Sequence, residues 1–148
     1  DDLKLEEFYW TDQGWEVKVK FFEKAETLNF TFKAAIFDNP VYPDKAMELV
    51  FQNLITEDNI KFIFIDGKKP RSYEKGLKKI LWSKGLSVNK LRTVRNERSY
   101  FGIQMADALA GLVRYNADNP QAKDATKIIN KYRKKAIYFA EFNFEKIK

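Results

Sequence analysis

Short apolar runs with the period of β-strands alternate along this chain with longer segments that have the period of amphipathic helices. This alternation restricts the fold strongly, because helices that separate strands in the sequence cover the faces of a parallel or mixed sheet. Residues 60–65 form a continuous β-branched and aromatic run, which is typical of a central strand buried on both faces. We therefore predict an α/β fold in which helices flank a layered mixed or parallel sheet.

Turn-forming and helix-capping residues set the expected boundaries of these elements. Asp38-Asn39-Pro40 ends one strand, Gly85 is typical of the residue that follows a helix, and Pro120 favours a first helical turn. Residues 137–144 fit either a helix or a strand. The expected helices cover residues 15–27, 43–56, 72–84, 100–115 and 120–135, and the expected strands cover residues 28–37, 60–65 and 88–94.

Length and composition indicate one compact domain over residues 1–148. Of the 148 residues, 45% are hydrophobic, and no Pro/Gly/Ser-rich linker interrupts them. The longest apolar runs fall far short of the roughly 20 residues that a membrane-spanning helix needs. Residues 1–4 have neither the basic start nor the apolar stretch of a secretory signal. We therefore expect a cytoplasmic protein without a membrane partner.

Cysteine and histidine are both absent from the sequence. Their absence excludes disulfides, thiol nucleophiles, structural zinc sites and imidazole catalysis. An enzyme with this composition would use carboxylates, amines, hydroxyls or a hard metal ion, and Asp and Glu oxygens favour Mg²⁺, Mn²⁺ or Ca²⁺. Carboxylates are therefore the side chains in which a catalytic site is to be sought.

The net charge of +6 is unevenly distributed along the chain. Residues 1–66 hold 7 Lys and Arg against 14 Asp and Glu, whereas residues 67–148 hold 20 against 7. Such a basic half is typical of a surface that faces a polyanion. The alternative is a set of Lys-rich helices that are simply well solvated.

Two aspartates are the strongest candidates for a functional site. Asp66 ends an apolar strand, where open α/β sheets collect ligands, although Asp66-Gly67 is also a common turn pair. Asp107 lies in a segment, residues 99–111, whose expected helix is apolar over most of its circumference, which predicts a buried carboxylate. Because a buried carboxylate needs a partner, Asp107 either binds a metal ion or pairs with Arg114.

Residues 99–111 also carry the most informative motif, Ser-x-x-Gly-Ile-Gln-Met-Ala-Asp-Ala-Leu-Ala-Gly. This motif resembles the closing motif of a bacterial and phage family, domain of unknown function 3800 (DUF3800), and the resemblance covers about residues 17–118. The family is associated with a ribonuclease H-like fold and metal-dependent nuclease activity. The resemblance implies that Asp66 and Asp107 are catalytic metal ligands for Mg²⁺ or Mn²⁺, with Ser99 and Gln104 supporting the site.

One departure from the family concerns its first strand, which carries an Asp-Glu-Ser-Gly motif that this chain lacks. That motif should supply the first metal ligand. On this resemblance the chain is expected to be the C-terminal part of a longer ribonuclease H-like protein. Glu6 or Glu7 could replace the missing ligand, and nothing in the local sequence favours either.

Three functions are consistent with these features. The first is a metal-dependent nuclease that acts on DNA or RNA. The second is a non-catalytic module of the same fold that binds nucleic acid or a partner, which the missing opening motif favours. The third is an oligomerisation domain that packs on a second copy through the apolar residues 137–144. The residues expected to contact nucleic acid are Lys68, Lys69, Arg71, Arg92, Arg95 and Arg98.

Overall fold

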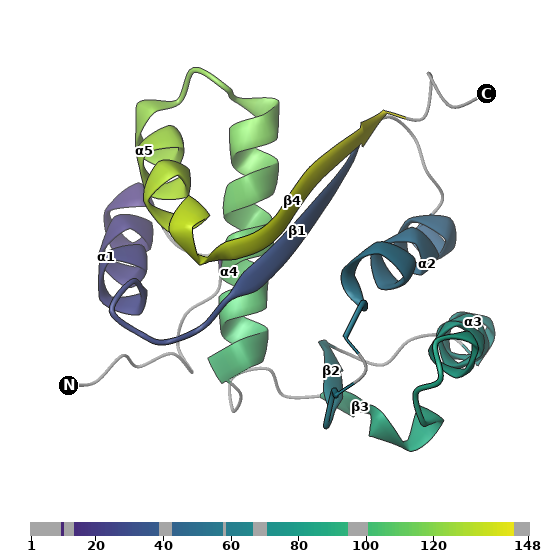
Figure 1. Cartoon of the computed structure of the whole chain (residues 1–148). Coiled ribbons are helices and arrows are strands. Elements are labelled where there is room, and N and C mark those ends of the chain that lie inside the picture. The colour runs from purple at the N-terminus through teal and green to yellow at the C-terminus, as the bar shows by residue number, and fades with distance from the viewer. Residues whose placement is uncertain are drawn as a thin grey trace. The chain divides into compact units, whose positions relative to one another are not determined.

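The structure is a computed structural model that describes residue 10 and residues 14–38, 43–57, 59–66, 71–94 and 101–143 (Figure 1). These residues contain five α-helices and four strands, which make the chain a mixed α/β protein. The helices are α1 (Trp15–Ala25), α2 (Pro43–Leu54), α3 (Arg71–Ser83), α4 (Phe101–Asp118) and α5 (Lys123–Tyr132). The strands are β1 (Phe32–Asp38), β2 (Ile63–Asp66), β3 (Leu91–Val94) and β4 (Ala136–Asn143).

The predicted helices are confirmed, and their ends lie within three residues of those expected. Gly85, which follows α3, has a φ of 76°, the left-handed conformation that glycine adopts most readily after a helix. The strands begin later than predicted. Before β3, the Ser87 hydroxyl accepts a hydrogen bond from the Asn89 amide at 3.2 Å, and this cap turns Val88–Lys90 into a 3-10 helix. None of the described helices is long and apolar enough to cross a membrane.

The chain divides into two compact units. The first consists of Asp1–Ala34 and Glu97–Phe139, and the second consists of Ala35–Asn96 and Ala140–Lys148. Each unit therefore combines two separate stretches of chain. Because the chain passes from one unit to the other more than once, no single linker separates them as it would two successive domains. The single domain over residues 1–148 stays a prediction.

The first unit is built from α1, α4 and α5, with α5 packed against both other helices (Figure 1). Phe22 of α1, Leu112 of α4 and Tyr132 of α5 are among its most deeply buried side chains. The Tyr132 hydroxyl donates a hydrogen bond of 2.5 Å to the Phe22 carbonyl oxygen, which joins α5 to α1. Burial raises the pKa of this hydroxyl far above its usual range, so it stays protonated as the donor.

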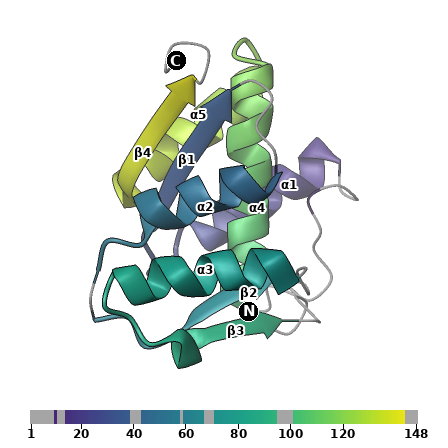
Figure 2. The same cartoon turned by 90° about the vertical axis from the view of Figure 1, so that its right-hand side faces the viewer.

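The second unit places α2 and α3 over the parallel β2–β3 pair (Figure 2). Ile63 and Ile65 point from β2 into a cluster formed with Phe51 of α2 and Leu77 of α3. The prediction that this strand is buried on both faces is wrong, because the two helices cover only one. A continuous apolar run does not reveal how many faces of a strand are covered.

The described strands form two separate pairs, β1–β4 and β2–β3, rather than the single layered sheet predicted. The partner of β1 is β4, in the segment whose sequence fits either a helix or a strand. Phe37 and Phe142 stack across this pair with ring centroids 5.2 Å apart. The α/β class is therefore confirmed, and the arrangement of its strands differs from the prediction.

Candidate functional site

Asp66 is the last residue of β2, as predicted, and lies opposite Val94 at the end of β3. The two strands run parallel, and their carboxyl ends form the edge at which open α/β sheets gather ligands. The Asp66 side chain lies outside the described part of the structure, as do Ser99, Lys68, Lys69, Arg95 and Arg98.

Asp107 lies within α4, and its side chain is exposed, so the prediction of a buried carboxylate is wrong. Ala106 and Ala110 are exposed as well. Alanine is small and is the best helix former, so it is common on exposed helix faces and indicates burial poorly. The buried side of α4 is formed by Ile103, Gln104, Met105, Ala108, Leu109, Leu112 and Val113.

The alternative pairing of Asp107 with Arg114 in a buried ion pair is also wrong. Arg114 Nε lies 3.8 Å from Asp118 Oδ2, and both of these side chains are largely exposed. Such an exposed pair four residues apart contributes only about 0.3–0.5 kcal/mol. The Asp107 carboxylate is therefore accessible from solvent.

Gln104, predicted to support the site, is buried one helical turn before Asp107. It is the single buried polar residue among the described positions. Its amide lies on the buried side of α4, where a polar group is stable only when its atoms are hydrogen-bonded. A role in supporting the site stays a prediction.

A metal site needs several oxygen ligands that converge on one point. Within the described residues, no group of three or more Asp, Glu, His or Cys could hold a metal ion. Asp66 belongs to the second unit and Asp107 to the first. Their predicted pairing as metal ligands stays a prediction.

One pair of carboxylates that the sequence did not reveal lies on the β1–β4 pair. Asp38 ends β1, and a hydrogen bond with its side chain raises the pKa of Glu141 on β4. The negative charge of Asp38 acts in the same direction. The sequence predicted Asp38 to end a strand. It did not predict that Glu141 lies beside Asp38, because residues 137–144 fit either a helix or a strand.

The outer face of α3 carries four exposed cations and an exposed indole. At about 100° per residue, these side chains fall within an arc of roughly 100° on the side opposite the buried Tyr73, Leu77 and Ile80. Trp82 is 79% exposed. We call this surface the basic face of α3, and its residues are Arg71, Lys75, Lys78, Lys79 and Trp82.

Of these five residues, only Arg71 was predicted from the sequence to contact nucleic acid. The signal for the others was present, because a helical wheel over the predicted third helix separates the cations from the apolar side. The one acidic residue of α3, Glu74, lies outside the arc. Arg92 of β3, also predicted to contact nucleic acid, is exposed, and its Cζ lies 5.1 Å from the centre of the Phe62 ring.

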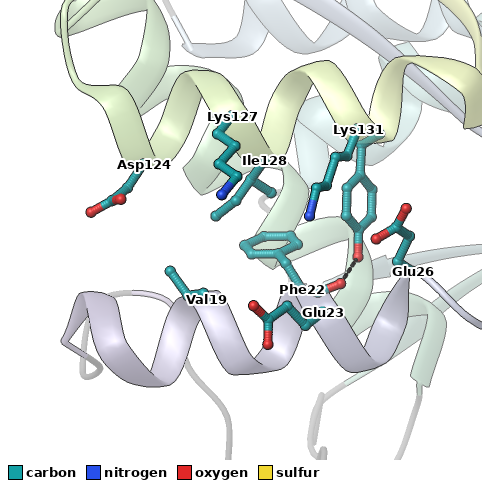
Figure 3. Close-up of a pocket in the computed structure, with 9 residues that line it drawn as sticks. Val19, Phe22, Glu23, Glu26, Asp124, Lys127, Ile128 and Lys131 are labelled. Atoms are coloured by element: carbon teal, nitrogen blue, oxygen red, sulfur yellow. Dashed lines mark hydrogen bonds between the residues drawn. The ribbon is translucent and has the colours of Figure 1, made fainter.

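A small cleft of about 90 Å³ lies between α1 and α5 (Figure 3). Glu23 of α1 and Glu26, the residue that follows α1, line one side of it, and Lys127 and Lys131 line it from α5. A hydrogen bond from Lys134, 2.8 Å long, lowers the pKa of Glu26. The cleft is well below the roughly 300 Å³ of a typical small-molecule site, and its mixed charges do not suit a polyanion.

Comparisons with protein-family models, with curated proteins and with solved structures give no match to this chain. The resemblance to DUF3800 and the ribonuclease H-like fold therefore stay predictions. Among the described residues, the basic face of α3 gathers the most exposed side chains of one chemical kind on a single surface.

Proposed function

We propose that this chain is a nucleic-acid-binding domain, and the observation that carries the proposal is the basic face of α3. Its cations are exposed, share one side of a helix and have no acidic residue among them. Cations that neutralise phosphates release condensed counterions, and this release supplies much of the affinity for nucleic acid. The exposed ring of Trp82 adds a surface on which a base can stack.

The charge pattern of the surrounding chain supports the same function. Residues 71–94 hold seven Lys and Arg against a single acid, Glu74. A helix that is merely solvated usually mixes both signs, as α1 does where Lys20 lies 3.6 Å from Glu16. The basic face of α3 has one sign only, which favours an external polyanion as its partner.

Removing three charges from this face is expected to weaken nucleic-acid binding by at least about tenfold near 50 mM salt. The variant combines Lys75→Gln, Lys78→Gln and Lys79→Gln, all at exposed positions. The slope of log affinity against log salt should fall by about three, because each lost phosphate contact removes about one unit. Fluorescence anisotropy with a labelled oligonucleotide, between about 50 and 200 mM salt, measures both quantities.

The matched control removes three exposed cations from the first unit, Lys20, Lys24 and Lys127, and so changes the net charge equally. Binding should fall much less in this control. Equal losses in both variants would show that only net charge matters and would contradict an α3 interface. A wild-type protein that binds no nucleic acid even at low salt would reject the proposed function.

A metal-dependent nuclease is the second candidate, and the position of Asp66 at the carboxyl edge of a parallel strand pair favours it. By resemblance to DUF3800, Asp66 and Asp107 would bind Mg²⁺ or Mn²⁺ in a ribonuclease H-like fold. The exposed Asp107 is accessible to an ion. Two carboxylates provide only part of the coordination that such an ion needs, so no cleavage step follows from them.

The proposal also includes a cytoplasmic location and a homo-oligomer. A nucleic-acid-binding function fits the cytoplasmic location expected from the sequence. The homo-oligomer expected through residues 137–144 has less surface available for contact, because β4, which covers most of that segment, pairs with β1. Ile137 is the apolar side chain of β4 that is most exposed, at 59%.

Mn²⁺ at about 5–10 mM is expected to raise the melting temperature of the wild-type protein if the nuclease proposal holds. An ion present at about ten times its dissociation constant adds roughly 1.4 kcal/mol, which corresponds to about 3–6 °C for a chain of this size. The rise should disappear in Asp66→Asn and in Asp107→Asn. Thermal melts with and without the ion test this prediction.

Glu141→Gln provides the control for the metal experiment, because it removes one partner of the carboxylate pair on β1–β4. This variant should keep the metal-dependent rise. If the rise is lost in Glu141→Gln and kept in Asp107→Asn, the ion binds at Asp38 and Glu141 instead. An unchanged wild-type melt would reject metal binding, while nucleic-acid binding by α3 would be unaffected.

A further inference from the structure

The face of β2–β3 opposite α2 and α3 presents two aromatic rings to solvent. Phe62 is 53% exposed and Phe64 is 45% exposed, and their ring centroids lie 6.1 Å apart. Ile63 and Ile65 point the other way, into the core cluster. Because side chains alternate along a strand, Phe64 lies on the opposite face of the sheet, and the ring of Phe62, directly before β2, lies beside it.

Arg92 lies on the same face, because the register places it opposite Phe64. Its guanidinium Cζ is 5.1 Å from the centre of the Phe62 ring, within the range of a cation–π contact. The Nη1 atom of Arg92 donates to the carbonyl oxygens of Asn89 and Leu91, which holds the guanidinium beside the ring. We call the group of Phe62, Phe64 and Arg92 the aromatic platform.

The surroundings of the aromatic platform are basic. Residues 59–66 and 88–94 together contain three cations, Lys61, Lys90 and Arg92, against one acid, Asp66 at the end of β2. Lys61, directly before Phe62, is exposed. A partner that complements this face must therefore combine negative charge with flat apolar surfaces. A second copy of the same face would bring Arg92 and Lys61 against like charges, which opposes self-association.

We propose that the aromatic platform binds the unpaired bases of a single-stranded nucleic acid. Bases stack on exposed aromatic rings and on guanidinium planes, while neighbouring cations contact the phosphates. The two Phe rings are tilted by 47° to one another, which suits bases that are splayed apart rather than kept in a continuous stack. A duplex keeps its bases stacked and paired, so the platform selects single strands.

This inference rests on the proposed nucleic-acid-binding function and adds the substrate class to it. The cations of the basic face of α3 contact phosphates, which duplexes and single strands both offer. The platform and that face lie on opposite sides of the β2–β3 pair, because α3 packs on the sheet face that carries Ile65. Substitutions can therefore test one surface without altering the other.

The experiment measures the affinity of the full chain for a labelled oligothymidylate of about 16 nucleotides and for a duplex of the same length. Phe62→Leu and Phe64→Leu keep an apolar side chain but remove the ring. Each should weaken single-strand binding about tenfold and leave duplex binding unchanged, since stacking on one ring accounts for roughly that factor. Phe62→Tyr keeps a ring and should bind as the wild type does.

Ile137→Ala is the matched control, because Ile137 is similarly exposed, at 59%, but lies on β4. It should leave both affinities unchanged, and thermal melts of all variants establish that they are folded. If the Leu variants bind the single strand as tightly as the wild type does, the proposed role of the aromatic platform is wrong. This holds even if the α3 variant loses affinity for both the single strand and the duplex. If sedimentation shows a wild-type dimer that the Leu variants dissociate, the face is an interface between copies and the proposal is wrong.

Discussion

Phe22→Ala is expected to lower the free energy of unfolding by about 3–5 kcal/mol, a large fraction of the stability of a domain of this size. Phe22 is 1% exposed, and its ring centroid lies 5.4 Å from that of Phe21 and 5.3 Å from that of Tyr132. Truncation removes contacts that join α1 to α5 and leaves a cavity that rigid helices cannot fill. Urea unfolding followed by circular dichroism measures the change.

The control is the same substitution at an exposed ring, Phe62→Ala, which should cost no more than about 1 kcal/mol, because it removes an exposed cation–π contact with Arg92 and leaves no deep cavity. Similar losses at both positions would contradict the burial of Phe22 in the first unit.

The number of unfolding transitions in urea also shows whether the two units unfold together. A single transition shifted by Phe22→Ala supports one cooperative domain over residues 1–148, whereas a shift in only one of two transitions shows that the units unfold separately.

The helices were predictable because their signals are local. The apolar period of each segment and the turn residues at its ends depend only on neighbours in the sequence, and a positive φ at Gly85 is a local requirement. Strand pairing is different, because it depends on a partner elsewhere in the chain. The pairing of β1 with β4 joins Phe37 to Phe142, and no local pattern in either strand specifies it.

The basic face of α3 could be predicted from the sequence, because the charges of its residues and the period of a helix are enough to place them on one side. The burial of individual side chains could not be predicted in the same way, because it was inferred from the apolar character of their neighbours. Asp107 was expected to be buried because its helix is apolar over most of its circumference, yet two of the residues counted as apolar, Ala106 and Ala110, lie on the exposed side of α4. Phe62 and Phe64 were expected in the core because they are apolar, yet they face solvent. In both cases the number of covering elements decides burial, and a single segment does not contain that information.

Gly111→Ala is the second substitution with a large expected effect. A Cβ atom at Gly111 would lie 2.4 Å from Cγ of Trp10, far closer than two carbon atoms can approach. Cγ is the first ring atom of the indole, and rotation about the Cβ–Cγ bond leaves it in place. The ring therefore cannot avoid the new methyl group by that rotation alone. The absence of a side chain at Gly111 is therefore what allows the Trp10 ring to pack against α4.

Displacing Trp10 would disturb several contacts in the first unit. Its ring centroid lies 5.7 Å from that of Trp15 and 6.2 Å from that of Phe22, and Lys18 Nζ lies 4.0 Å from its centre. The helix propensity of alanine offsets up to about 1 kcal/mol of the loss, whereas overpacking costs about 1–3 kcal/mol. The expected net effect is a destabilisation of about 1–2 kcal/mol, accompanied by a change in tryptophan fluorescence.

Gly102→Ala is the matched control on the same helix, since a Cβ at Gly102 meets no heavy atom within 4 Å. It should stabilise the protein by up to about 1 kcal/mol, so the two substitutions are expected to have opposite signs. The decisive measurement repeats Gly111→Ala in a Trp10→Ala background, where the steric conflict is absent. In that background Gly111→Ala should become neutral or stabilising, because only the propensity of alanine for the helix remains. If it stays as destabilising as in the wild type, Trp10 does not pack on Gly111, and the loss has to come from another neighbour of α4.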